Sequence, residues 1–173
     1  HESTRRQRQM CIRDRSRGQW AEFQVEDLLG IMDYKEGIHY ETQKIMKSGT
    51  KPDFTFYLPD DKSINMDSKF PLTIYMEISK LNRDLEDETL DEIARREITD
   101  SIKAKTKEFL DKAIKTKIDD TASREGYIAP DEDTVDFVLM YIPLENLYHF
   151  LLTSVIGSSK TPVIEYAFSR KVI

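Results

Sequence analysis

Three residues in the first half of the chain have the types and spacing of a divalent-metal site. Asp53 follows Pro52 where one β-rich segment begins, and Asp67 closes another, with Lys69 two positions later. Because residues two apart on a strand project from the same face, Asp67 and Lys69 would reach one pocket. Carboxylates suit Mg²⁺, and a bound Mg²⁺ or Mn²⁺ polarises a phosphate and activates water. The pattern therefore predicts phosphodiester hydrolysis, with Asp53 and Asp67 as metal ligands and Lys69 as a catalytic residue.

Charged residues make up 34% of the chain, so a Pro-Asp pair followed by Asp-x-Lys can also arise by chance. In that alternative, Asp53 and Asp67 merely flank turns, and Lys69 and Glu22 are solvated. Glu22 lies in a predicted helix and could bring a third carboxylate to the metal and to the catalytic site. The order of these residues along successive predicted elements favours the metal site.

Further polar residues are candidates for accessory roles. Gln43 could face the site from the preceding strand or serve as a surface hydrogen-bonding residue. For Glu145 a structural role is favoured, because a carboxylate is stabilising at a helix N-terminus. A lysine-rich segment is either a solvated helix face or a set of contacts to the DNA backbone. Its candidate contacts are Lys103, Lys107 and Lys112.

The elements that must hold the acidic residues follow from the spacing of apolar residues. In residues 18–33 apolar residues recur every three or four positions, which predicts an amphipathic helix. Residues 39–46, 53–58 and 63–68 are β-rich and separated by short turns, which predicts three antiparallel strands in a meander. Trp20 is expected to fill the gap between this helix and the sheet.

The second half of the chain is expected to be mostly helical around one strand. Residues 135–142 form a nearly continuous apolar run, as in a strand that is buried on both faces. Residues 119–133 contain a glycine and a proline and are predicted to form a loop. At 171–173 the chain is expected to enter another strand. Helices are predicted at 71–79, 88–118, 144–155 and 162–169.

The composition is that of one globular domain in a reducing compartment. The chain has 173 residues, 39% of them hydrophobic, and lacks an apolar run of about 20 residues that could span a bilayer. The single cysteine, Cys11, cannot form an internal disulfide, so a cytoplasmic protein is expected. The net charge of −6 argues against a general nucleic-acid binder. Contact with DNA would need a local basic patch or a metal ion.

The first sixteen residues differ from the rest of the chain. Residues 1–16 show neither helical nor strand periodicity and contain few apolar residues. Residues 9–16, QMCIRDRS, resemble a translated sequencing adapter, and a natural basic arm is the alternative. We therefore expect a non-native or disordered leader followed by a folded domain over residues 17–173, and we do not interpret the arginines of the leader as a DNA-binding patch.

The predicted order of elements, αβββαβ, resembles the core of PD-(D/E)xK nucleases. Within that superfamily the chain is similar to the RmuC family, because motifs of that family occur here in the same order. They are GQWAE at 18–22, YETQ at 40–43, PDFTFYLPD at 52–60, DSK at 67–69 and DFVLMYIPLE at 136–145. Ala21 replaces a glycine of the family pattern, a change between two small residues that should be tolerated.

The resemblance implies a fold and a function. The fold would be α/β (α+β), with a restriction-endonuclease-like core in which helices flank a mixed central sheet. The function would be that of a metal-dependent DNA nuclease or DNA-processing factor in recombination, with DNA as partner, Mg²⁺ or Mn²⁺ as cofactor and no small-molecule cofactor. The alternative is a non-catalytic module that binds DNA structures, or a scaffold that limits recombination. Compared with the family, the chain would be a fragment, truncated at its C-terminus and lacking the segments that supply a coiled coil for oligomerisation or a membrane anchor.

Overall fold

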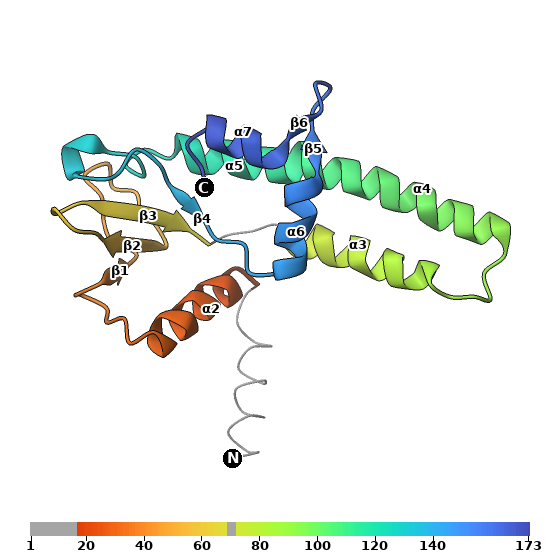
Figure 1. Cartoon of the computed structure of the whole chain (residues 1–173), viewed down its shortest axis with the longest axis horizontal. Coiled ribbons are helices and arrows are strands. Elements are labelled where there is room, and N and C mark those ends of the chain that lie inside the picture. Colours follow the sequence, from red (N-terminus) through yellow and green to blue (C-terminus); the bar gives the residue numbers. More distant parts are fainter. Residues whose placement is uncertain (1–16, 69–71) are drawn as a thin grey trace, which may run out of the picture. The chain divides into compact units, whose positions relative to one another are not determined.

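The computed structural model describes residues 17–68 and 72–173 as a mixed α/β protein (Figure 1). These residues form two compact units, each assembled from segments that are distant in sequence. The first, called here the sheet unit, comprises residues 17–68, 124–143 and 171–173. The second, the helical unit, comprises residues 72–123 and 144–170.

A four-stranded mixed sheet is the centre of the sheet unit (Figure 1). Its strands, in the order of their pairing, are β1 (Tyr40–Thr42), β2 (Phe54–Tyr57), β3 (Ser63–Asp67) and β4 (Leu139–Met140). β1, β2 and β3 pair antiparallel, so the predicted meander is confirmed. β4 pairs parallel with β3, and the chain between them is the long crossover that a parallel pair requires.

The helix α2 (Arg17–Ile31) confirms the first predicted helix and packs on one face of the sheet. The buried apolar cluster that joins them contains Val25, Leu29, Tyr40, Phe54 and Met66. Val25 and Leu29 lie one helical turn apart, as the apolar spacing of the helix requires. Trp20 lies at the edge of this core, because its side chain is only half-buried and lines a surface hollow with Phe23 and Tyr141.

The segment that contains β4 differs from its prediction. The sequence predicts a strand over 135–142 that is buried on both faces, but β4 has two residues, and Val138 alone in this run is fully buried. Thr134 forms an isolated bridge with Ser63, and regular pairing with β3 resumes at Leu139. The residues between these points leave the ladder, so only the end of the apolar run forms a regular strand.

The last three residues lie beside this segment, which agrees with the strand entry expected at 171–173. Val138 N donates to the Lys171 carbonyl (2.9 Å), and Ile173 N donates to the Val138 carbonyl (3.0 Å). Met140 N donates to the Ile173 carbonyl (2.8 Å). The segment around β4 therefore has hydrogen-bonded neighbours on both sides.

Long helices form most of the helical unit (Figure 1). They are α3 (Leu72–Leu85), α4 (Glu92–Glu108), the π-helical turn η1 (Phe109–Ile114) and α5 (Lys115–Ser123). Asp91 caps α4 by accepting a hydrogen bond from Ala94 N (2.7 Å), so the long helix begins later than predicted. It also continues into the predicted loop, because Ile118 and Thr121 are fully buried and extend the packed face by one turn.

The helices α6 (Glu145–Thr153) and α7 (Val163–Ser169) confirm the last two predicted helices. Between them β5 (Val155–Ile156) and β6 (Thr161–Pro162) form an antiparallel hairpin that the sequence does not predict. Each of its strands has two residues, too few to show an alternating pattern. Within residues 17–68 and 72–173, no helix combines the length and the apolar character needed to cross a membrane.

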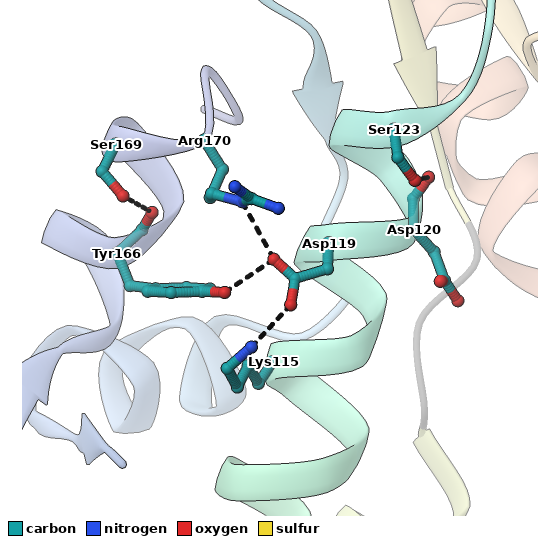
Figure 2. Close-up of polar contacts among 7 residues, drawn as sticks. All are labelled: Lys115, Asp119, Asp120, Ser123, Tyr166, Ser169 and Arg170. Carbon is teal, nitrogen blue, oxygen red and sulfur yellow. Dashed lines mark hydrogen bonds and ion pairs between the residues drawn. The ribbon is translucent and has the colours of Figure 1, made fainter. Parts of the chain in front are cut away.

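A charged cluster centred on Asp119 joins α5 to α7 (Figure 2). Asp119 accepts hydrogen bonds from Lys115 Nζ (2.7 Å), the Tyr166 hydroxyl (2.6 Å) and Arg170 Nε (3.0 Å). Burial alone would raise the pKa of Asp119, but these hydrogen bonds and the charges of Lys115 and Arg170 outweigh it and lower the pKa. The ionised carboxylate therefore holds the end of α7 against α5.

Candidate metal and nucleic-acid site

One face of the sheet is polar although it is buried. Its side chains, each at most 1% exposed, are Asp53, Thr55, Asn65 and Asp67. They alternate along β2 and β3 with Phe54 and Met66, which face α2, so they project to the opposite side of the sheet. Buried polar groups are costly unless they are hydrogen-bonded, and Thr55 Oγ1 accordingly donates to Asn65 Oδ1 (2.6 Å).

Asp53 and Asp67 lie opposite each other on this buried polar face. Phe54 is paired with Met66 in the antiparallel register, so Asp53 and Asp67 are the next residues outward. Directly opposed residues of an antiparallel pair project from one face, with Cβ atoms about 4.5–5.5 Å apart. The register thus brings together the two carboxylates that the sequence predicts as metal ligands.

The carboxylate of Asp53 is fixed by three hydrogen bonds. Its Oδ2 accepts from Ser68 N (2.8 Å) and from Ser68 Oγ (2.9 Å). Its Oδ1 accepts from Gln43 Nε2 (3.2 Å), and the main-chain N of Gln43 donates to the Asp53 carbonyl (3.2 Å). Gln43 therefore reaches the site from the end of β1, and the orientation of Asp53 is set by residues on both neighbouring strands.

A turn at residues 124–127 lies against the polar face, and the sequence does not predict its place there. Asn65 Nδ2 donates to the Tyr127 carbonyl (3.0 Å), and the Tyr127 hydroxyl donates to the Lys51 carbonyl (3.1 Å). Arg124 Nη1 donates to the Tyr127 hydroxyl (3.0 Å), and its guanidinium carbon lies 5.4 Å from the centre of the Tyr127 ring. The turn falls within a predicted loop, where its glycine was the available signal.

Arg124 brings a positive charge close to the two carboxylates. Burial would lower the pKa of Arg124, but the hydrogen bond to Tyr127 and the negative charges of Asp67 and Asp53 outweigh it and raise the pKa. Burial raises the pKa of the Tyr127 hydroxyl and, together with the charges of Asp67 and Asp53, outweighs the hydrogen bond and charge of Arg124, which lower it. Tyr127 therefore remains a neutral hydroxyl that donates to Lys51, and Arg124 remains charged.

The carboxylates of Asp53 and Asp67 are a pair of oxygen ligands of the kind that a divalent cation binds. Among residues 17–68 and 72–173, no three His, Cys, Asp or Glu side chains are grouped so that they could hold a metal ion. Mg²⁺ does not need such a cage, because one or two carboxylates usually bind it while water or phosphate oxygens fill its other positions. Asp53 and Asp67 are the residues that would hold such an ion.

The sequence also predicts Glu22 and Lys69 as catalytic residues. Glu22 lies on α2, about one turn before Val25, and is half-buried. The helix α2 packs on the apolar face of the sheet, whereas the two carboxylates project from the opposite face. Lys69 follows Ser68 in sequence and lies outside the described residues. The roles of Glu22 and Lys69 therefore stay predictions.

The three lysines predicted to contact DNA belong to the helical unit, whereas the carboxylates belong to the sheet unit. Each forms an ion pair about one turn away along its own helix: Lys103 with Asp100 (3.4 Å), Lys107 with Asp111, and Lys112 with Glu108 (3.7 Å). The lysine side chains are still 72–78% exposed. Such pairs are typical of a solvated helix face, and contact with DNA stays a prediction.

Glu145 occupies the first turn of α6, as the structural role favoured by the sequence requires. Its carboxylate lies 3.6 Å from His149 Nε2 one turn later and is 87% exposed. The N-cap residue, Leu144, has no side-chain hydrogen bond to the helix, so Glu145 contributes its charge near the helix N-terminus without capping it. Glu145 belongs to the helical unit, whereas the carboxylate pair belongs to the sheet unit.

Several curated proteins resemble the chain over most of its length. It is 33% identical over 135 residues to the DNA recombination protein RmuC homolog of Pasteurella multocida, a match that covers 76% of this chain and 23% of that protein. It is 29% identical over 160 residues to the protein of the same name in Haemophilus influenzae, covering 90% of this chain and 31% of that protein. The chain thus spans about a quarter to a third of the length of these relatives. No solved structure matches it.

The family assignment rests on a match over nearly the whole sequence. The model of the RmuC family matches residues 7–173. This range includes the sheet, the helix α2, the paired Asp53 and Asp67, and the turn that carries Arg124. The chain belongs to the RmuC family.

Proposed function

We propose that the chain is a metal-dependent DNA-processing domain that hydrolyses phosphodiesters at a PD-(D/E)xK site on a restriction-endonuclease-like core. The observation that carries the proposal is the opposition of Asp53 and Asp67 on one buried face of the sheet. The element order of helix, antiparallel meander and parallel fourth strand supports it. The relatives are named as DNA recombination proteins, and a cytoplasmic role in recombination, with DNA as the partner, is part of the proposal.

The residues of the chain prepare this site before any substrate arrives. Asp53 and Asp67 would hold Mg²⁺ or Mn²⁺, which when bound polarises a phosphate and lowers the pKa of its water. Ser68 and Gln43 fix the carboxylate of Asp53, so it does not have to reorient when it binds. Lys69, which follows Ser68, would orient the attacking water and offset the charge of the phosphate.

Cleavage of labelled DNA tests the proposal. We expect this chain to cut at least one of single-stranded, duplex and hairpin DNA in Mg²⁺ or Mn²⁺, and not in EDTA. Asp67→Asn should abolish the cleavage, whereas Asp61→Asn, in the exposed turn between β2 and β3, should retain it. If a folded wild-type chain cuts none of the three substrates in either metal, it is not a nuclease.

A non-catalytic module that binds DNA structures is the second candidate. It is favoured by the hydrogen bonds of Asp53, because a carboxylate that accepts from Ser68 and Gln43 already ties the ends of three strands together. In that case DNA binding would persist in EDTA and in Asp67→Asn, without cleavage. Binding measured by fluorescence anisotropy, with and without metal, separates the two candidates.

A further inference from the structure

Within the sheet unit, the turn at residues 124–127 lies close against the loop before β2. Gly126 has φ +83°, and a Cβ at this position would lie 2.4 Å from Ser48 Oγ. The hydroxyls of Ser48 and Thr50 both donate to the Glu125 carbonyl. The loop before β2 therefore fixes the main chain of the turn, and with it the starting points of the Arg124 and Tyr127 side chains.

Tyr127 connects the turn by hydrogen bonds to the chain segments that carry the two carboxylates. Its side chain is 0% exposed, and its carbonyl accepts from Asn65, two residues before Asp67 on β3. Its hydroxyl donates to the Lys51 carbonyl, two residues before Asp53. Since Arg124 bonds to the same hydroxyl, its guanidinium is held at the Asp53 end of the buried polar face. Against the effect of burial, the hydrogen bond to Tyr127 raises the pKa of Arg124, and the charges of Asp67 and Asp53 add to the rise.

Arg124 keeps the capacity to bind an anion. A guanidinium has five N–H donors, and the hydrogen bond to Tyr127 uses one of them. The side chain is partly exposed, so a ligand can reach it. Its planar donor fork matches the oxygens of a phosphate better than the point charge of a lysine does.

The charges of the site give the arginine a role beside a metal. Asp53 and Asp67 carry two formal negative charges, and Arg124 carries one positive charge. A divalent ion on the carboxylates would leave the group with one net positive charge, which a single phosphodiester neutralises. Without Arg124 the same metal-loaded group would be neutral and would attract the phosphate less.

We propose that Arg124 is a phosphate-binding residue of the carboxylate site, held in place by the turn at residues 124–127. The inference deepens the proposed function and rests on it, because the phosphate belongs to DNA. It makes two predictions of opposite sign. Removing the charge of Arg124 weakens DNA binding, because a phosphate loses a charged donor. The same change leaves Mg²⁺ binding as tight as before or tighter, because a competing cation has gone.

The test compares wild type with Arg124→Gln, Arg124→Lys and the control Arg83→Gln, which removes an exposed arginine of α3. Mg²⁺ affinity is measured by calorimetric titration. Affinity for a fluorescein-labelled hairpin DNA is measured by anisotropy in Ca²⁺, which takes the same oxygen ligands, over a series of salt concentrations. We expect Arg124→Gln to weaken DNA binding roughly tenfold and to reduce the slope of log affinity against log salt by about one. Arg124→Lys should recover the slope and part of the affinity, and Arg83→Gln should match wild type.

Each other outcome overturns the inference for a stated reason. DNA affinity unchanged in Arg124→Gln would make Arg124 a countercharge for the aspartates and nothing more. A parallel loss of Mg²⁺ and DNA binding would show that Arg124 only supports the structure of the turn. Failure of the proposed function looks different, because the wild-type chain itself would then show no metal-dependent binding or cleavage of DNA.

Discussion

Ser68 donates two hydrogen bonds to the carboxylate of Asp53, one from its main-chain N (2.8 Å) and one from Oγ (2.9 Å). Ser68 is the residue directly after β3, and Asp53 is the residue directly before β2. The contact therefore closes the end of the β2–β3 pair with a candidate metal ligand. The carboxylate of Asp53 thus both stabilises the end of the sheet and is a candidate metal ligand. Substitutions that alter its contacts should therefore affect stability as well as function.

Ser68→Ala should lower the free energy of unfolding by about 1.5–3 kcal/mol, because a buried carboxylate loses a hydrogen-bond donor. Urea denaturation followed by circular dichroism measures the change. Ser159→Ala is the control, since its hydroxyl contacts Thr161 in an exposed turn and its loss should cost no more than about 0.5 kcal/mol. Equal effects of the two substitutions would mean that the Ser68 hydroxyl does not stabilise Asp53.

Asp67→Asn should remove most of the stabilisation that Mg²⁺ or Mn²⁺ confers on the folded chain. An ion that binds only the folded state adds about 2.7 kcal/mol at a hundredfold excess over its dissociation constant. Without metal the variant should be as stable as wild type or slightly more so, because one of two opposed negative charges is gone. Thermal melts with and without metal measure both effects. An identical metal response in the two proteins would remove the physical basis of the metal site.

Lys69→Ala should separate metal binding from catalysis. The lysine is expected to act on the water and the phosphate, so its loss should leave the metal-induced rise in melting temperature unchanged. Any DNA cleavage should fall by at least about a hundredfold, the scale of a positioned acid–base group. Lys62→Ala, which removes an exposed lysine between β2 and β3, is the matched control. Loss of metal binding in Lys69→Ala would contradict this division of roles.

The elements that position Asp53 and Asp67 follow from local sequence signals. Asp53 begins one short β-rich segment and Asp67 closes the next, and a tight turn joins the two segments. An antiparallel pair joined in this way puts the two residues opposite each other. The helix α2 follows from apolar spacing, and its Val25 and Leu29 do face the sheet. The β2–β3 pair depends on residues close in sequence, and the buried face of α2 depends on the apolar spacing within the helix, and that is why both could be predicted.

The contribution of Arg124 and Tyr127 could not be predicted in the same way. Both lie in a segment that is predicted to be a loop. The contacts of Tyr127 with Lys51 and Asn65 join residues more than fifty positions apart, and Arg124 is placed through its hydrogen bond to Tyr127. The parallel pairing of β4 with β3 is equally long-range, and it includes only Leu139 and Met140 of the strand expected over 135–142. Periodicity describes which face of an element is buried, but it does not identify the distant segment that covers that face.

Asp119→Asn should destabilise the chain at neutral pH and have little effect in acid. The pKa of Asp119 is lowered in the folded state, so its contribution is complete above the unfolded value of about 3.9 and is lost as pH falls through the lower folded value. At pH 7 the loss should be about 1.5–3 kcal/mol, the scale of a hydrogen bond to a charged group.

Asp120→Asn is the matched control for this pH effect. Asp120 is exposed, and its carboxylate points away from the cluster in Figure 2. Melting temperatures of wild type and both variants from pH 7 down to about pH 3 measure the effect, over the range in which aspartates titrate. If the melting temperatures of wild type and Asp119→Asn differ by the same amount at every pH in this range, the ionised carboxylate of Asp119 does not hold α7.

Gly126→Ala should destabilise the chain more than Gly157→Ala, although both glycines have positive φ, +83° and +70°. The left-handed conformation costs an alanine roughly 1–2 kcal/mol at either position. At Gly157 a Cβ would meet Ser159 Oγ at 3.9 Å, an ordinary contact, whereas at Gly126 it would meet Ser48 Oγ at 2.4 Å and Met46 Cβ at 3.1 Å. The difference between the two variants in urea unfolding therefore measures the close approach of the turn that holds Arg124. Adding Ser48→Ala to Gly126→Ala should recover part of the additional loss in the free energy of unfolding, because it removes Ser48 Oγ, the atom nearest to the new Cβ. If both glycine variants lose the same free energy of unfolding, and the double variant recovers none of it, the turn is not anchored on the loop before β2.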